Sequence, residues 1–150
     1  MDVSIIIVSW NAKEYLLKCL HSIVNQNHNL SYEIIVVDND SDDGSPEAVK
    51  QQFPSVRLIQ NDDNYGFAKA NNIGIEQAKG RYLALVNSDV EVFPGCLDSL
   101  FQFMENNSTI GLCGPKILNA DHTLQPSAMY FPSIRMSITH SLALHRVFPK

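Results

Sequence analysis

Short apolar runs alternate along this chain with segments of helical periodicity, and this alternation constrains the fold more than any other feature. The runs are rich in Ile, Val and Leu and are bounded by polar residues, which is the pattern of strands buried on both faces of a sheet. Strands separated by helices at this pitch form a mostly parallel sheet with helices on both faces, so we predict an α/β fold. The expected strands are residues 3–8, 34–37, 56–59, 82–86 and 110–113.

Each expected helix has a start signal or one apolar stripe. Asn11 and Glu14 have the spacing of a capping box, which predicts that the first helix starts there. Ser45 stands before a proline at the expected start of the second helix. The third helix follows a loop at residue 64 and is expected to end at Gly80 as its C-cap. The fourth begins after Pro94, and its expected buried stripe is Leu97, Leu100, Phe101 and Met104.

Composition narrows the class of protein. The net charge of −5 over 150 residues gives no electrostatic reason to expect nucleic acid as a partner. Cys19, Cys96 and Cys113 are odd in number and widely spaced, which favours reduced thiols in a cytoplasmic protein. The histidines lack metal-ligand spacing, so we expect no zinc site. No apolar run approaches the roughly 20 residues that span a bilayer.

Polar residues follow the expected strands at their carboxyl ends. Right-handed crossovers place all these ends on one edge of a parallel sheet, which is where open α/β sheets bind ligands. Ser9, Asp38, Asn39, Asn64 and Asp89 are therefore expected to gather there. This convergence is the central structural prediction from the sequence.

Asp38, Asn39 and Ser41 have side chains that can hydrogen-bond a base or a ribose. The alternative is a turn with helix-capping side chains, for which residues 38–45 are equally suited. No Gly-x-Gly-x-x-Gly and no Gly-Lys-Ser/Thr motif is present, which disfavours a Rossmann dehydrogenase and a P-loop NTPase. A bound diphosphate then needs a divalent cation, Mg²⁺ or Mn²⁺, with Asp89 as its ligand. The alternative for Asp89 is an Asx-turn, and Glu91 is either a supporting acid or a solvated one.

The helix entrance at residues 64–72 is rich in amides. Gly66 allows a ligand to approach the backbone closely, and Asn71 and Asn72 point toward the same edge on a helix that starts there. Capping and a solvated helix face are the alternative reading, and we prefer it for Lys69. Two aromatic residues either stack on a base or close the rim of the core, namely Trp10 and Tyr65.

Four collinear motifs together resemble the family 2 glycosyltransferases of GT-A fold. They are residues 8–11 (VSWN), 37–45 (VDNDSDDGS), 64–72 (NYGFAKANN) and 85–92 (LVNSDVEV), and residues 114–117 (GPKI) and 131–133 (FPS) extend the match. The chain looks most like the rhamnosyltransferase-type branch of cell-surface polysaccharide synthesis.

The resemblance implies inverting transfer of a sugar from a nucleoside-diphosphate donor, dTDP- or UDP-linked, to a saccharide or lipid-linked saccharide acceptor. It implies that Asp38 and Asn39 hold the base and ribose, and that residues 87–89 stand at the Asp-x-Asp metal motif. Asn87 replaces the first acid of that motif, which should weaken metal binding. The donor-binding set expected from residues and resemblance together is Ser9, Trp10, Asn11, Asp38, Asn39, Ser41, Asn64, Gly66, Asn71, Asn87 and Ser88, with Asp89 on the metal.

A general base in a later acidic segment is also implied, yet no Glu or Asp follows Asp121. We therefore expect residues 1–118 to be a nucleotide-sugar-binding core, and residues 119–150 to begin an acceptor-side region with a hairpin around residues 119–122 and a weakly helical tail at 136–148. A non-catalytic nucleotide- or partner-binding module is the alternative. A cytoplasmic location, peripheral to the inner membrane face in the full-length enzyme, and a homodimer through unpaired apolar surface complete the expectations.

Overall fold

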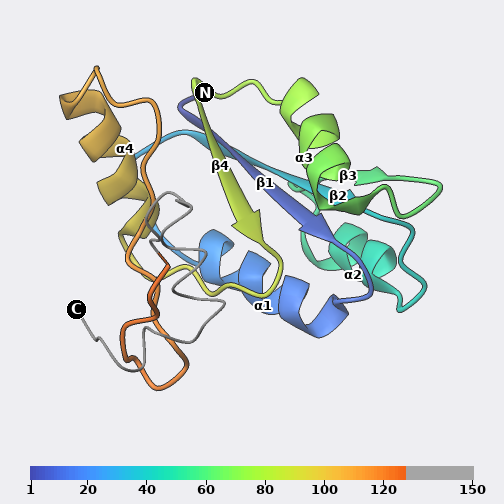
Figure 1. The fold of residues 1–150 in the computed structure, drawn as a ribbon. Coiled ribbons are helices and arrows are strands. Elements are labelled where there is room, and N and C mark those ends of the chain that lie inside the picture. Colours follow the sequence, from blue (N-terminus) through green and yellow to red (C-terminus); the bar gives the residue numbers. More distant parts are fainter. Residues whose placement is uncertain (128–150) are drawn as a thin grey trace, which may run out of the picture. The chain divides into compact units, whose positions relative to one another are not determined.

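The computed structural model describes residues 1–127. The described residues divide into two units, Met1–Gly114 and a second one that begins at Pro115. The first unit holds all the regular elements (Figure 1): β1 (Val3–Ser9), α1 (Lys13–Val24), β2 (Tyr32–Asp38), α2 (Ser45–Gln52), β3 (Arg57–Gln60), α3 (Gly66–Glu76), β4 (Tyr82–Asn87) and α4 (Cys96–Asn106). The expected helix tail at 136–148 and the motif at 131–133 lie outside the described residues.

The four strands form one sheet in the order β3-β2-β1-β4, and every pairing is parallel. The two central strands carry uninterrupted apolar runs because helices cover both of their faces: Ile5, Ile6 and Ile7 are all fully buried. Burying one such side chain contributes about 1.5–3 kcal/mol relative to its exposure. The predicted α/β class with a parallel sheet is confirmed.

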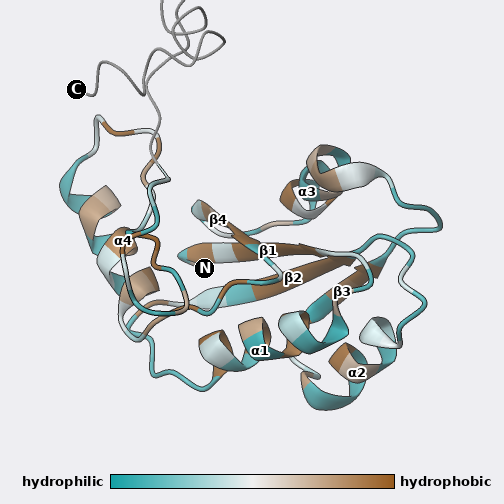
Figure 2. Cartoon of the chain, turned by 60° about the horizontal axis from the view of Figure 1, so that its bottom comes forward, coloured by the Kyte–Doolittle hydropathy of each residue, from teal (hydrophilic) through white to brown (hydrophobic). Residues whose placement is uncertain are grey.

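Helices cover the sheet from both sides (Figure 2). α1 and α2 lie on one face and α3 on the other. The larger core joins alternate residues of β1 and β2 to the apolar stripe of α1, which includes Leu16, Leu20 and Ile23. Leu97 of α4 is buried in the same core, whereas the other expected stripe residues of that helix, Leu100, Phe101 and Met104, are only partly buried.

Two glycines allow α3 and its exit to pack closely on the sheet. A Cβ on Gly74 would stand 2.6 Å from the Ile6 Cγ2 atom, and a Cβ on Gly80 would stand 2.3 Å from the Ser4 backbone nitrogen. The prediction that Gly80 caps the third helix is wrong, because that helix ends at Glu76 with Gln77 as its C-cap. Gly80 is required by its contact with β1 instead.

β4 departs from the expectation of burial on both faces. It is an edge strand, and its residues alternate between partly buried and exposed. Leu83 and Leu85 are paired in register with Ser4 and Ile6, and their side chains are 46% and 53% exposed. Because α3 packs on β1 and β2, it leaves this part of the sheet face uncovered.

Residues 110–113 do not form the expected fifth strand; their backbone has no regular structure. An apolar run this short needs a neighbouring strand to supply its hydrogen bonds, and none of the described strands pairs with it. In the second unit, the expected hairpin is confirmed as an antiparallel bridge between Leu118 and Leu124. Asn119 N–H donates to the Thr123 carbonyl at 2.9 Å within it.

Candidate functional site at the carboxyl edge of the sheet

The parallel register brings polar residues from three strands to one edge of the sheet. Ser9 is paired with Asp38, and Val8 is paired with Asn87, so the exits of β1, β2 and β4 are neighbours (Figure 1). This is the convergence that the sequence predicts for Ser9, Asp38 and Asp89. The edge has a buried part at β1 and β2 and an exposed part at the end of β4.

Ser9 and Asp38 form the buried part, and each is only 1% exposed. Asp38 Oδ2 accepts a hydrogen bond from the Ser41 backbone N–H at 3.0 Å. Asp38 Oδ1 and Ser9 Oγ are buried and have no partner among the described residues. A buried oxygen without a partner costs about 1–3 kcal/mol, so these two oxygens, on residues paired in register, are candidates for contact with a ligand.

Asn39 is nearly as buried as Asp38, but its side chain is engaged within the protein. Its Nδ2 donates to Asn64 Oδ1 at 3.2 Å, and its Oδ1 accepts from Asn61 Nδ2 at 2.8 Å. Asn64 Oδ1 also accepts the Gly66 N–H at 3.0 Å. This amide network fastens the loop before α3 to the end of β2. The hydrogen bonds of Asn39 and Asn64 therefore give these two residues a structural role, which is to link the two segments.

A second network joins the exits of β1 and β2. Asn11, which has a positive φ of 48°, donates its N–H to Ser41 Oγ at 2.9 Å and accepts the Asp42 N–H on Oδ1 at 2.9 Å. The expected capping box is wrong: α1 begins at Lys13, and its free N–H groups are met instead by Asp43 Oδ2, which accepts the Lys13 N–H at 2.8 Å. No local pattern identifies this cap, because it comes from 30 residues away.

The environment of Asp43 fits that capping role. Burial alone raises the pKa of its carboxyl, but hydrogen bonds from the Ser45 side chain and from the Lys13 and Ser45 backbone outweigh burial and leave the pKa below its ordinary value. Asp43 is therefore ionised where it faces the positive end of the α1 dipole. In the sequence Asp43 is one of residues 38–45, for which a turn with helix-capping side chains is the alternative reading, and no local pattern singles it out.

The exposed part of the edge opens into a cleft of about 830 Å³. Among the predicted residues it is lined by Asn11, Asn87, Ser88 and Asp89. Its remaining wall is largely apolar and includes the rings of Tyr15 and Phe67, which the sequence analysis did not propose as site residues. Both residues are largely exposed, at 60% and 59%, and no motif in the sequence marks either of them as part of a site.

Other predicted residues stand outside this cleft. Asn71 is buried and donates to the Phe67 carbonyl within its own helix at 2.9 Å. Gly66 has a φ of 76°, so its backbone conformation explains the glycine. Lys69 lies over the Tyr65 ring, 3.4 Å from its centroid, which pairs these two side chains with each other. Trp10 and Glu91 are exposed.

The donor atoms near the end of β4 are chemically suited to a hard cation. Asp89 offers a carboxylate, Asn87 an amide oxygen and Ser88 a hydroxyl, and oxygen ligands of this kind are preferred by Mg²⁺ and Mn²⁺. Within residues 1–127 no group of three or more His, Cys, Asp or Glu side chains stands close enough to hold a metal. A cation at Asp89 would thus take much of its shell from a ligand and water.

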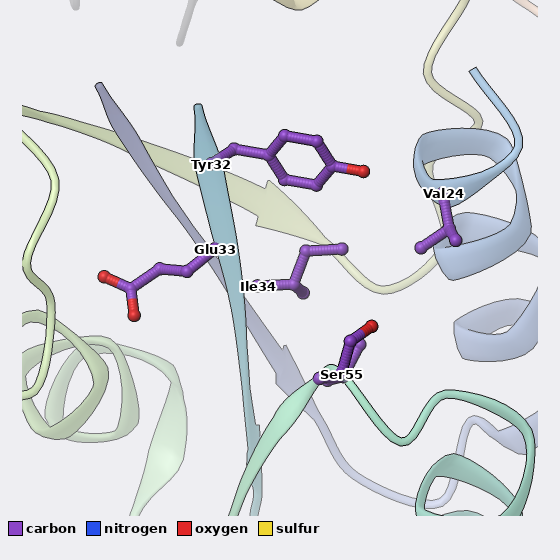
Figure 3. Close-up of a pocket in the computed structure, with 6 residues that line it drawn as sticks. Val24, Tyr32, Glu33, Ile34 and Ser55 are labelled. Carbon is purple, nitrogen blue, oxygen red and sulfur yellow. The ribbon is translucent and has the colours of Figure 1, made fainter. Parts of the chain in front are cut away.

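A smaller pocket of about 220 Å³ lies at the other end of the sheet, beside the start of β2 (Figure 3). Tyr32 and Ile34 point toward Val24 of α1 across this pocket, whereas Glu33 points to the opposite side of the strand. On that side the Glu33 carboxylate accepts hydrogen bonds from the Ser4 hydroxyl at 2.6 Å and from the Lys79 N–H at 2.7 Å. The pocket therefore has no charged group aimed into it and no evident chemistry.

Comparison with known proteins agrees with this geometry. Residues 4–146 match the family model described as glycosyl transferase family 2. The chain is 31% identical over 147 residues to TuaG of Bacillus subtilis, a glycosyltransferase assigned to teichuronic acid biosynthesis, covering 95% of this chain and 56% of TuaG. It is 30% identical over 120 residues to the N-acetylglucosaminyl-diphospho-decaprenol L-rhamnosyltransferase of Mycobacterium tuberculosis, covering 73% and 39% of the two chains.

Solved structures show the same fold. TarS 1–349 of S. aureus in complex with UDP-GlcNAc aligns with a TM-score of 0.66 at 25% identity, over 72% of this chain and 32% of TarS. The mannosyltransferase PcManGT of Pyrobaculum calidifontis, in complex with GDP-Man and Mn²⁺, aligns with a TM-score of 0.53 at 27% identity, over 58% and 27%.

This chain belongs to glycosyl transferase family 2 and has the GT-A fold, as the motifs predict. It spans just over half of TuaG and a smaller share of the other relatives named above. No helix among the described residues has the length and apolarity needed to cross a membrane.

Proposed function

We propose that this chain binds a nucleoside-diphosphate sugar at the carboxyl edge of its sheet. Such a site would serve inverting transfer of the sugar to an acceptor hydroxyl during cell-surface polysaccharide synthesis. One observation carries the proposal: Ser9 and Asp38 keep unpartnered buried oxygens at the same edge of the sheet at which Asn87, Ser88 and Asp89 line an open cleft. Related structures support the ligand class, since TarS was solved in complex with UDP-GlcNAc and PcManGT in complex with GDP-Man and Mn²⁺.

Each part of the edge has its own task in this proposal. Asp38 and Ser9 accept hydrogen bonds from the base and ribose, because their free oxygens are acceptors that a ligand N–H or O–H satisfies. Asn39, Asn64, Asn11 and Ser41 hold the loops that frame them. The rings of Tyr15 and Phe67 exclude water from one side of the cleft.

Asn87, Ser88 and Asp89 are proposed to face the diphosphate, with Asp89 holding Mg²⁺ or Mn²⁺. The cation, when bound, neutralises charge on the diphosphate as it leaves. Asn87 contributes a neutral oxygen where a second carboxylate would bind the cation more tightly, so we expect weak metal binding without nucleotide and stronger binding with it. The donor is dTDP- or UDP-linked, the acceptor is a saccharide or lipid-linked saccharide, and the site of action is the cytoplasmic face of the membrane.

Calorimetric titration with UDP, dTDP and GDP, each with and without Mn²⁺, tests the proposal. We expect one nucleotide to bind more tightly with Mn²⁺, and Asp89→Ala to abolish that gain while leaving metal-free binding intact. Glu76→Ala is the matched control, since it removes an exposed carboxylate at the far end of α3. If no nucleotide binds the folded protein under any of these conditions, the proposed function is wrong for this chain.

A further inference from the structure

The last turns of α1 face the loop between β4 and α4, residues 88–95. This loop carries Asp89 and leads into α4 through Gly95, which has a φ of 77°. Within and beside the loop, Val90 N–H donates to the Asn87 carbonyl at 3.3 Å, and Cys96 N–H donates to the Phe93 carbonyl at 3.1 Å. The middle of the loop also contacts residues at the end of α1.

The side chains of Ser22, in the last turn of α1, and Gln26, just after α1, bind both backbone groups of Val92. Val92 N–H donates to Ser22 Oγ at 2.9 Å, and Gln26 Nε2 donates to the Val92 carbonyl at 2.7 Å. The Val92 side chain is 8% exposed and lies in the larger core. This one residue is thus fastened by two hydrogen bonds and by packing, as a residue in a sheet would be.

The chemistry of the two holding side chains is specific. Ser22 Oγ donates to the Cys19 carbonyl at 2.7 Å while it accepts from Val92, so it must be both donor and acceptor. The Gln26 side-chain nitrogen faces the carbonyls of both Ser22 and Val92, so only a donor fits that position. A carboxylate there would face two carbonyl oxygens and repel them.

We propose that Ser22 and Gln26 are positioning residues that hold Asp89 in place for a metal-bound nucleotide. Asp89 lies between two fixed points of its loop, the end of β4 and Val92. On the β4 side the Cys19 thiol donates to the Asn87 carbonyl at 3.6 Å, so α1 contacts both ends of the segment. This inference rests on the proposed function, because it assigns the two side chains to the same cation site.

Gln26→Glu is the sharpest test, because it changes the donor to an acceptor at constant size. We expect the Mn²⁺-dependent gain in nucleotide affinity to fall about tenfold or more, the range typical for residues that orient metal ligands. Affinity without metal should stay as in the wild type, because Ser9 and Asp38 are untouched. A general loss of structure would weaken both measurements, so their ratio separates positioning from folding.

Ser22→Ala should reduce the same ratio, and Ser22→Thr should restore it by returning the hydroxyl. Gln51→Glu is the matched control, since it makes the same charge change on the exposed end of α2 and should leave the ratio unchanged. A ratio that stays at the wild-type value in both Gln26→Glu and Ser22→Ala overturns the proposal.

Amide hydrogen exchange at Val92 tests the hold itself without any ligand. Faster exchange of this amide in Ser22→Ala, with unchanged exchange in β1 and β2, supports the hold; unchanged exchange at Val92 overturns it. The wild-type protein could bind no nucleotide while the Val92 amide responds as expected. The proposed function would then be wrong, and so would the assignment of Ser22 and Gln26 to a metal site. Their role in fixing the loop at Val92 would still be supported.

Discussion

The two parts of the sheet edge are built differently. The β1 and β2 side is buried, and the loops around it are cross-linked by the Asn39–Asn64 and Asn11–Ser41 networks. The β4 side is an exposed edge strand followed by a loop that is bound by Ser22 of α1 and by Gln26, which follows α1. We infer that the part proposed to bind the base is formed before a ligand arrives, while the part proposed to bind the diphosphate depends on a few replaceable contacts. The following predictions test that contrast.

Asp38→Asn should have the largest effect, and its effects on binding and stability should have opposite signs. Asparagine keeps an acceptor for the Ser41 N–H but replaces the unpartnered oxygen by a donor. Loss of a hydrogen bond to a charged group costs about 1.5–3 kcal/mol, so nucleotide affinity should fall by about tenfold to a hundredfold, with and without Mn²⁺. The new amide nitrogen also lacks a partner, but burying a neutral amide costs less than burying a carboxylate, so the free energy of unfolding should rise by up to about 1 kcal/mol.

Calorimetry on Asp38→Asn measures the change in nucleotide affinity, and urea unfolding of the same variant measures the change in unfolding free energy. Ser9→Ala is a useful companion, since it removes the other unpartnered oxygen at nearly constant volume. Wild-type affinity in Asp38→Asn would mean that the buried oxygens do not contact a ligand. The contrast between the two parts of the edge would then lose its functional meaning.

Asn39→Ala should act mainly by lowering the free energy of unfolding, because the Asn39 side chain binds other residues of the protein. It leaves the Asn61 and Asn64 amides without their partner at the end of β2. We expect the free energy of unfolding to fall by about 1–3 kcal/mol, the cost of breaking a buried polar network. Asn72→Ala is the control, because Asn72 is exposed on the same helix that the network precedes. Equal unfolding curves for the two variants would contradict the scaffold role.

Most of the fold could be predicted because its signals are local. Buried strands and helix stripes are written in consecutive residues, and parallel pairing then brings Ser9, Asp38 and Asn87 together. The failures have non-local causes. The cap of α1 comes from Asp43, and the hold on Val92 comes from Ser22 and Gln26.

The wrong strand predictions have a similar origin. The apolar run of β4 fits burial on both faces, but burial depends on which elements lie over the strand, and that is not encoded in the run itself. Residues 110–113 are apolar enough for a strand but have no partner among the described ones. Local patterns therefore predict an element more reliably than they predict its neighbours.

The Asp98 carboxylate should make the stability of the β4 side depend on pH. Its Oδ1 accepts the Asn29 N–H at 2.7 Å, and its Oδ2 lies 3.0 Å from His28 Nδ1, which ties α4 to the loop after α1. Burial raises the pKa of Asp98, but the Asn29 N–H and the His28 ring outweigh burial, and the net pKa lies below the ordinary 3.8. A lowered folded-state pKa gives stability that is complete well above pH 3.8 and is lost as pH falls through the folded value.

Asp98→Asn should therefore be less stable than the wild type at neutral pH by about 1 kcal/mol, and the difference should shrink below pH 3.8. Urea unfolding at a series of pH values measures it. Asp42→Asn, which removes an exposed carboxylate, should stay within about 0.5 kcal/mol of the wild type at neutral pH. A difference for Asp98→Asn that grows on acidification would reverse the assigned sign.

The smallest effect is expected at Arg81 and Glu105, which join the start of β4 to the end of α4. Their side chains lie 2.8 Å apart but are 66% and 35% exposed, so solvent screens the pair. Glu105→Gln keeps an acceptor for the Tyr82 hydroxyl, which donates to Glu105 Oε1 at 2.7 Å, and removes only the charge. We expect a loss of about 0.2–1 kcal/mol in unfolding free energy at low salt, which disappears in 1 M NaCl. A larger loss that persists in salt would show that α4 is bound to β4 as firmly as the loops around Asp38 are bound to one another. The two parts of the sheet edge would then differ in exposure but not in rigidity.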